Sequence, residues 1–220
     1  MGAVEDDEEM LQDGGVQVRD LLSQPELTET LRLVAGAAGA NRRISHPRVQ
    51  KSGLVLVEHS QGIVPSRVQV LGETEITYLE KQDAETRRSR VRFLFGLNLS
   101  LVVLTRGVEP LPELVEQAEA TGTALVVSSP RSSTTINAIH AVLDRVLAPS
   151  ATLHGVFVEV HGIGTLLTGP SGIGKSECAL FLVERGHRLV ADDVVHVTRM
   201  ATRYLVGTPA PLLRHHREIR

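Results

Sequence analysis

Short apolar runs alternate with segments of helical periodicity over most of the chain. The apolar runs are predicted to be strands and span residues 53–59, 67–72, 99–107 and 124–130. The segments between and after them are predicted to be helices and span residues 74–82, 84–96, 112–122 and 132–147. Short strands rich in Val and Leu that alternate with helices are typical of βαβ units. We therefore expect the α/β fold class, with an N-terminal α/β domain built on a mostly parallel sheet.

Proline and glycine residues that interrupt or end helical patterns divide the chain into predicted domains. Residues 16–35 are predicted to form two helices separated at Pro25, the second ending at Gly36. Further along, Ala148-Pro149-Ser150 interrupts the helical pattern and indicates a domain boundary. We expect three parts, which are an acidic tail over 1–15, an N-terminal domain over 16–148 and a second domain over 151–220.

The second domain opens with two predicted β-segments within residues 153–169, joined at the turn His161-Gly162. A helix is predicted over 176–186, two short strands flank a pair of acids within 188–198, and another strand is predicted over 203–207. One clear helix gives less cover than a parallel sheet buried on both faces needs. Either part of this domain was cut from the sequence, or other subunits supply the missing cover, or the domain is unstable. Of these three, we expect a truncated sequence with an incomplete second domain.

The composition is that of a globular protein and argues against nucleic-acid binding. Of the 220 residues, 42% are hydrophobic, which excludes disorder of the whole chain. Only 3% are aromatic, Trp is absent, and the net charge is −3. A base-stacking platform needs more aromatic side chains, and a protein that binds the phosphate backbone needs more positive charge. We expect no nucleic-acid partner.

The cysteine count and the N-terminal sequence indicate the cellular compartment of the protein. The single cysteine, Cys178, cannot form an internal disulfide, which is typical of a reducing compartment. No apolar run is long enough to cross a membrane, and residues 1–13 are acidic where a signal peptide is basic and then apolar. We expect a cytoplasmic protein with a solvated acidic tail and no membrane partner.

The strongest chemical signal is the run Gly169-Pro170-Ser171-Gly172-Ile173-Gly174-Lys175-Ser176, which fits G-x-x-x-x-G-K-[ST]. An apolar segment precedes it and a helical pattern follows it. In such a loop, backbone N–H groups converge on phosphate oxygens at a helix N-terminus. Lys175 would reach the β- and γ-phosphates, and the Ser176 hydroxyl would bind Mg²⁺. The pattern favours a nucleotide phosphate site over an ordinary glycine-rich turn.

Asp192 and Asp193 form the second signal, at the end of an apolar segment downstream of the loop. A carboxylate there can hold Mg²⁺ or its water, or accept a proton from an attacking hydroxyl. The pair can equally be a turn between strands, since Asp favours strand ends. The upstream phosphate loop favours a catalytic role, with one carboxylate for the metal and one for the proton.

Other candidate residues carry weaker signals. A lone histidine such as His154 is more often structural, and an acid such as Glu218 in a charged run is usually solvated. Cys178 lies in the first helical turn after the loop, where a thiol can become reactive, but we expect a small buried apolar residue. His215-His216 lacks partners at metal-ligand spacing, so we expect no zinc site.

A resemblance to a known family covers residues 16–220. The run HG-VFVEVHGIGTLLTGPSGIGKSECALFLVERGHRLVADDVV, followed by LLRHHREIR, resembles the HPr kinase/phosphorylase family. VRDLL, RVQVLGETEITYLE, LVVLTRGVEPLPEL and SSTTINAI are similar to that family's N-terminal domain. The resemblance implies a P-loop kinase domain similar to the nucleotide site of phosphoenolpyruvate carboxykinase. It also implies a homohexamer.

The resemblance assigns roles to matching residues. His154 matches the family's active-site histidine, and Asp193 matches the acid that accepts the serine proton and returns it in the reverse step. Asp192 is the neighbour that helps with the metal, and Glu218 in the EIR motif matches a second Mg²⁺-binding acid. Lys175 and Ser176 keep the roles given above.

Two departures from the family pattern limit the transfer of function. Pro170 stands where the family commonly has Asp or Glu, which removes a carboxylate and one N–H donor. The family continues beyond the position of Arg220 with a catalytic arginine and a loop important for dephosphorylation. The roles of those parts are not carried over.

Three hypotheses for the function follow. The leading one is an enzyme that uses Mg²⁺ and ATP to phosphorylate a serine on HPr, the phosphocarrier of the bacterial sugar phosphotransferase system, or on a paralogue. The same enzyme removes the phosphate with inorganic phosphate, giving pyrophosphate, and so regulates sugar uptake and carbon metabolism. The second is a non-catalytic regulator that binds nucleotide and a protein partner. The third is a P-loop kinase for a small metabolite, against which the N-terminal match counts.

Overall fold

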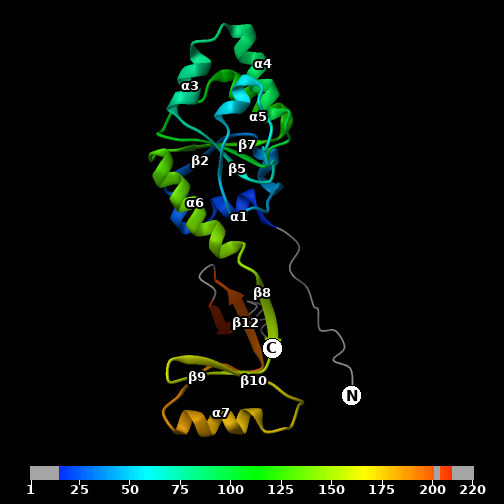
Figure 1. The fold of residues 1–220 in the computed structure, drawn as a ribbon, viewed down its shortest axis with the longest axis vertical. Coiled ribbons are helices and arrows are strands. Elements are labelled where there is room, and N and C mark those ends of the chain that lie inside the picture. Colours follow the sequence, from blue (N-terminus) through cyan, green and yellow to red (C-terminus); the bar gives the residue numbers. More distant parts are fainter. Residues whose placement is uncertain (1–14, 201–203, 210–220) are drawn as a thin grey trace, which may run out of the picture. The chain divides into compact units, whose positions relative to one another are not determined.

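The computed structural model describes residues 15–200 and 204–209, which belong to two compact units. The N-terminal unit is Gly14–Leu147, and the C-terminal unit begins at Ala148 (Figure 1). Among the described residues, no helix has the length and apolar character needed to cross a membrane.

The N-terminal unit is built on a five-stranded sheet with the order β2-β7-β6-β5-β4. Its strands are β2 (Leu31–Ala35), β4 (Gln50–Lys51), β5 (Val68–Leu71), β6 (Leu101–Leu104) and β7 (Ala124–Ser128). The pairs β4–β5, β5–β6 and β6–β7 are parallel, and β2 joins the β7 edge in the antiparallel direction. The predicted α/β fold with a mostly parallel sheet is confirmed for this unit. A separate two-stranded ladder joins β1 (Val16–Gln17) and β3 (Arg43–Ile44).

Helices cover both faces of this sheet (Figure 1). On one face lie α3 (Glu73–Glu80), α4 (Ala84–Phe95), α5 (Pro112–Thr121) and the 3₁₀ segment η2 (Gly53–Val57). On the other lie α1 (Val18–Leu22), α2 (Pro25–Thr28) and α6 (Ser132–Val146), and the 3₁₀ segment η1 (Ala37–Asn41) precedes β3. Side chains of β6 alternate between the two cores, Val102 and Leu104 toward one and Leu101 and Val103 toward the other. Burial on both faces explains why β5, β6 and β7 are continuous apolar runs.

Two predicted elements of this unit are wrong. Residues 31–35 form the edge strand β2 rather than the second half of a helix, because their backbone groups pair with the otherwise open edge of β7. Residues 53–57 form the 3₁₀ segment η2 rather than a strand. The place beside β5 is taken by β4, and η2 instead packs Val55 and Leu56 into the core.

The described residues of the C-terminal unit, 148–200 and 204–209, form two three-stranded sheets and one helix, α7 (Lys175–Glu184). One sheet has the order β10-β9-β11, and the other has the order β13-β12-β8. Their strands are β8 (Ser150–His154), β9 (Val156–Val160), β10 (Ile163–Leu167), β11 (Arg188–Ala191), β12 (Val194–Arg199) and β13 (Leu205–Pro209). The β9–β10 hairpin predicted at His161-Gly162 is confirmed.

The strands of the C-terminal unit pair differently from those of the N-terminal sheet. Every strand pair among its described residues is antiparallel. An antiparallel sheet tolerates one solvated face, so it needs less helical cover than a parallel one. A small core of Val156, Val158 and Ala179 joins β9 to α7.

Candidate functional site

The glycine-rich loop lies between the end of β10 and the start of α7. Gly172 and Gly174 have φ angles of +80° and +98°, a region that residues with a Cβ rarely adopt. Gly174 is the N-cap of α7 and supplies no side-chain acceptor, so the first N–H groups of the helix remain available to a ligand. This geometry suits an anion at the positive end of the helix dipole.

Lys175 is the first residue of α7, and its side chain folds back over the start of the loop. Its Nζ donates hydrogen bonds to the carbonyl oxygens of Gly169 and Pro170 at 2.8 and 3.0 Å. An ammonium group is therefore held on the loop itself, where it can exchange carbonyl partners for phosphate oxygens.

The two acids occupy the turn between β11 and β12. Asp193 has a φ of +75°, a conformation that Asp and Asn adopt more readily than other residues with a side chain. The N–H of Val194 donates to the carbonyl oxygen of Asp192 at 3.0 Å and closes the turn. Both acidic residues are exposed at this position.

His154 lies at the end of β8, and strand pairing brings it to the acids. His154 is opposite Val194 in the β8–β12 register, and the N–H of Gly155 donates to the carbonyl oxygen of Asp193 at 3.0 Å. A Cβ at Gly155 would lie 2.6 Å from the carbonyl oxygen of Leu167, the last residue of β10. The close approach therefore requires glycine and ties this segment to the strand that leads into the loop.

These segments surround one cavity of about 440 Å³. The predicted site residues that line it are His154, Gly169, Ser171, Gly172, Gly174, Lys175, Ser176, Asp192 and Asp193. Pro170 and Ile173 do not line it, although Pro170 contacts Lys175 through its carbonyl oxygen. Glu218 and His215-His216 lie outside the described residues.

The donor set of the cavity fits a hard divalent cation such as Mg²⁺. Ser176 offers a hydroxyl, and Asp192 and Asp193 offer carboxylates, the oxygen ligands that Mg²⁺ prefers. Over residues 15–200 and 204–209, no three His, Cys, Asp or Glu side chains form a complete metal-binding group. Mg²⁺ commonly keeps several waters and binds substrate phosphates, so a partial protein shell is the expected form of such a site.

Sequence reasoning missed three residues of the cavity and misjudged one beside it. Gly155, Val156 and Glu177 also line the cavity. The adjacency of Glu177 to the Gly-Lys-Ser sequence was an available signal for it. Cys178 is exposed rather than buried, because α7 turns Ala179 toward β9 and leaves the preceding residue at the surface.

Comparison with known proteins gives matches along nearly the whole chain. The family model described as HPr Serine kinase N terminus matches residues 16–143, and that described as HPr Serine kinase C-terminal domain matches residues 145–220. A protein of Geobacter sulfurreducens named HPr kinase/phosphorylase is 45% identical over 203 residues, which are 92% of this chain and 64% of that protein. A protein of the same name from Leptospira biflexa is 41% identical over 206 residues, 94% of this chain and 64% of that protein.

The chain thus spans about 64% of the length of these relatives. A crystal structure of the CBS and DRTGG domains of the regulatory region of Clostridium perfringens pyrophosphatase, complexed with diadenosine tetraphosphate, aligns with a TM-score of 0.42 and 16% identity. That alignment covers 64% of this chain and 56% of that one.

Proposed function

The chain belongs to the HPr serine kinase family, and from this premise we propose that its C-terminal unit transfers the γ-phosphate of ATP to a serine of HPr or a related phosphocarrier. One observation carries the proposal. The glycine-rich loop with Lys175 and the acid pair with His154 line the same cavity. A phosphate-binding element and a proton acceptor are both needed for phosphoryl transfer to a hydroxyl.

In the forward reaction, Asp193 accepts the proton of the serine hydroxyl while the serine oxygen attacks the γ-phosphorus. The bond from that phosphorus to the oxygen it shares with the β-phosphate breaks, and ADP leaves. Lys175 and the loop N–H groups hold the phosphates in line with the serine. His154 lies in the same cavity and contributes to the positioning of the reacting groups.

In the reverse reaction, inorganic phosphate attacks the phosphorus of phosphoserine. The bond between that phosphorus and the serine oxygen breaks, and protonated Asp193 returns its proton to the oxygen. The products are serine and pyrophosphate. One carboxyl group thus serves both directions, as an acceptor in the first and a donor in the second.

Mg²⁺, when bound, neutralises negative charge on the phosphate oxygens. Ser176 and Asp192 are the cavity residues that would hold it, and the resemblance adds Glu218 as a further ligand. We propose a domain division at 16–148 and 151–220, assembly as a homohexamer, and a cytoplasmic role in regulating sugar uptake. Family membership supports each of these proposals.

The direct test is transfer of label from γ-labelled ATP to purified HPr in the presence of Mg²⁺. Wild-type chain and an Asp193→Asn variant run side by side, with nucleotide binding measured separately on both. Label on an HPr serine that the variant does not produce supports the proposal. Equal nucleotide binding by both proteins with no label from either identifies a nucleotide-binding regulator instead. Label on a small molecule but never on HPr identifies a metabolite kinase.

A further inference from the structure

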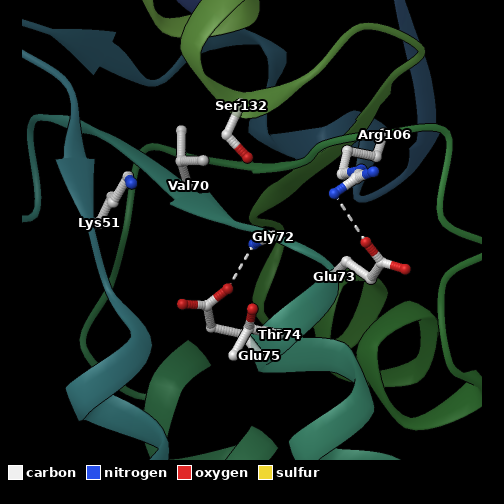
Figure 2. Close-up of a pocket in the computed structure, with 8 residues that line it drawn as sticks. All are labelled: Lys51, Val70, Gly72, Glu73, Thr74, Glu75, Arg106 and Ser132. Carbon is white, nitrogen blue, oxygen red and sulfur yellow. Dashed lines mark hydrogen bonds and ion pairs between the residues drawn. The ribbon is translucent and has the colours of Figure 1, made fainter.

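A polar cavity of about 160 Å³ lies in the N-terminal unit, and none of the proposed catalytic residues lines it. Lys51, at the end of β4, and Gly72, directly after β5, contribute to its wall. Arg106, which follows β6, and Ser132, at the start of α6, complete it together with the first turn of α3 (Figure 2). The carboxyl ends of three parallel strands thus meet here. In open α/β sheets, ligands bind in crevices outside the carboxyl ends of the strands.

Two helices bring their N-termini to this cavity from opposite faces of the sheet. The helix α3 packs into one core and α6 into the other, and Thr74 and Ser132 of their first turns line the cavity. Neither helix has a hydroxyl, carboxylate or amide cap from its N-cap residue, which is Gly72 for α3 and Arg131 for α6. Both helices therefore direct the positive ends of their dipoles at the cavity, and Glu73 and Glu75 in the first turn of α3 offset that charge at one of the two ends.

The charged side chains around the cavity leave a cation available. Lys51 is exposed and forms no ion pair with any residue in the described part of the chain. Arg106 pairs with Glu73 at 2.9 Å, where both side chains are more than half exposed. Glu75 accepts the N–H of Gly72 at 2.8 Å (Figure 2). Each carboxylate already has a partner, and an exposed pair such as Arg106–Glu73 opens at little cost.

A second, apolar cavity of about 410 Å³ adjoins the first. The two share Lys51, Thr74 and Glu75 as wall residues. Leu54 and Val57 of η2 line the apolar cavity and are 67% and 50% exposed, and Tyr78 of α3 lines it as well. An apolar surface directly beside Lys51 can bind the body of a ligand whose charged group enters the polar cavity.

We propose that the joined cavities bind a small organic anion, a phosphate ester or a carboxylate attached to an apolar body. The charged group lies between Lys51 and the first turns of α3 and α6, and the apolar body lies against Leu54 and Tyr78. This site is independent of the proposed chemistry in the C-terminal unit, and its occupant need not take part in phosphoryl transfer.

The test is a titration of the full chain followed by amide and methyl NMR shifts. Phenyl phosphate, benzoate and inorganic phosphate are added separately, and phenol serves as the uncharged analogue. The same titrations in a Lys175→Ala background exclude anion binding at the glycine-rich loop as the source. We expect saturable shifts at Gly72, Thr74 and Ser132 with the anions, and additional shifts at the Leu54 methyls with phenyl phosphate. Comparing phenyl phosphate with benzoate identifies which anion is preferred.

Two variants separate the polar and apolar contributions. Lys51→Gln is expected to weaken phenyl phosphate binding about tenfold, because a charge-assisted contact is lost. Lys81→Gln removes another exposed charge just beyond the other end of α3 and is expected to change nothing. Leu54→Ala is expected to weaken phenyl phosphate but not inorganic phosphate. The proposal is overturned if no anion shifts these amides, if Lys51→Gln binds as well as the wild type, or if phenol binds as tightly as phenyl phosphate.

Discussion

The N–H of Gly155 donates a hydrogen bond to the carbonyl oxygen of Asp193 at 3.0 Å. This contact joins the end of β8 to the turn between β11 and β12, and so sets His154 beside the acid pair. Because the acceptor is a backbone carbonyl, the contact does not depend on the carboxylate of Asp193. The chemistry of this residue can therefore be changed without breaking the link.

The first prediction concerns the carboxylate of Asp193. Asparagine tolerates the φ of +75° found at this position, so Asp193→Asn is expected to fold normally. It lacks the proton acceptor, and loss of general base catalysis typically costs about 10²- to 10⁴-fold in rate. We expect a loss in this range in the initial rate of HPr phosphorylation, with ATP binding within about twofold of the wild type. A variant that keeps its full rate would remove Asp193 from the reaction.

The second prediction concerns nucleotide binding by Lys175. Its ammonium already lies on the loop through hydrogen bonds to Gly169 and Pro170. Lys175→Ala is expected to weaken ATP binding at least about tenfold in calorimetric titrations, because a charge-assisted contact to phosphate is lost. Arg185→Ala is the matched control, since Arg185 is an exposed cation at the other end of α7. Equal weakening in both variants would indicate a general charge effect rather than a phosphate contact.

Sequence reasoning singled out the glycine-rich loop and the acid pair because both are local patterns. The glycine spacing and the following helix are encoded within residues 169–184, and the strands on either side of Asp192-Asp193 are short apolar runs. The sequence alone did not reveal the placement of His154, which depends on the β8–β12 register between residues 40 positions apart. Non-local strand pairing of this kind leaves no signal in one segment.

The wrong elements of the N-terminal unit have the same physical origin. Residues 31–35 have no strict alternation, and only pairing with β7 makes them a strand. Residues 53–57 have the composition of a buried strand, but β4 takes the place beside β5. Tertiary context overrode local preference in both segments. By contrast, the runs that became β5, β6 and β7 are buried on both faces, and their composition alone indicated strands.

The third prediction concerns pH and His140. Its Nε2 accepts the N–H of Val49 at 3.0 Å, which requires a neutral ring. Burial lowers the pKa of His140 below its ordinary value of 6.5, Arg48 lowers it further, and Asp144 opposes the shift. A lowered pKa in the folded state means that the unfolded state binds more protons below pH 6.5. The part of the unfolding free energy that this contact supplies is therefore fully present above pH 6.5. It is lost as the pH falls through the lowered pKa of His140.

Urea unfolding at about pH 7.5 and about pH 5.5 checks this sign. The chain has two tyrosines and no tryptophan, so Tyr78 fluorescence in a Tyr204→Phe background reports on the N-terminal unit. We expect a lower unfolding free energy at the lower pH, and a smaller difference in His140→Gln, which keeps an acceptor but does not titrate. His46, whose pKa is lowered by burial and by Arg67 and Arg48, contributes in the same direction and remains in the variant. An unchanged pH dependence in His140→Gln would assign the effect elsewhere.

The last prediction concerns the close approach of Gly36 to the loop before β7. Gly36 has a φ of +68°, and a Cβ there would lie 1.9 Å from the carbonyl oxygen of Thr123. Gly62 has a φ of +80° but has no atom within 4 Å of the equivalent position, so it isolates the cost of the backbone conformation. Gly62→Ala is expected to lose about 1 kcal/mol of unfolding free energy.

Gly36→Ala adds a clash with backbone and strains the hydrogen bond from its N–H to Glu119 Oε1, which is 2.8 Å long. We expect a loss of about 3 kcal/mol or more, because backbone atoms on both sides must shift. The same tyrosine fluorescence in urea compares the two variants directly. Equal losses would mean that the segment carrying Thr123 moves aside freely, and that the packing of η1 against β7 does not constrain this edge of the sheet.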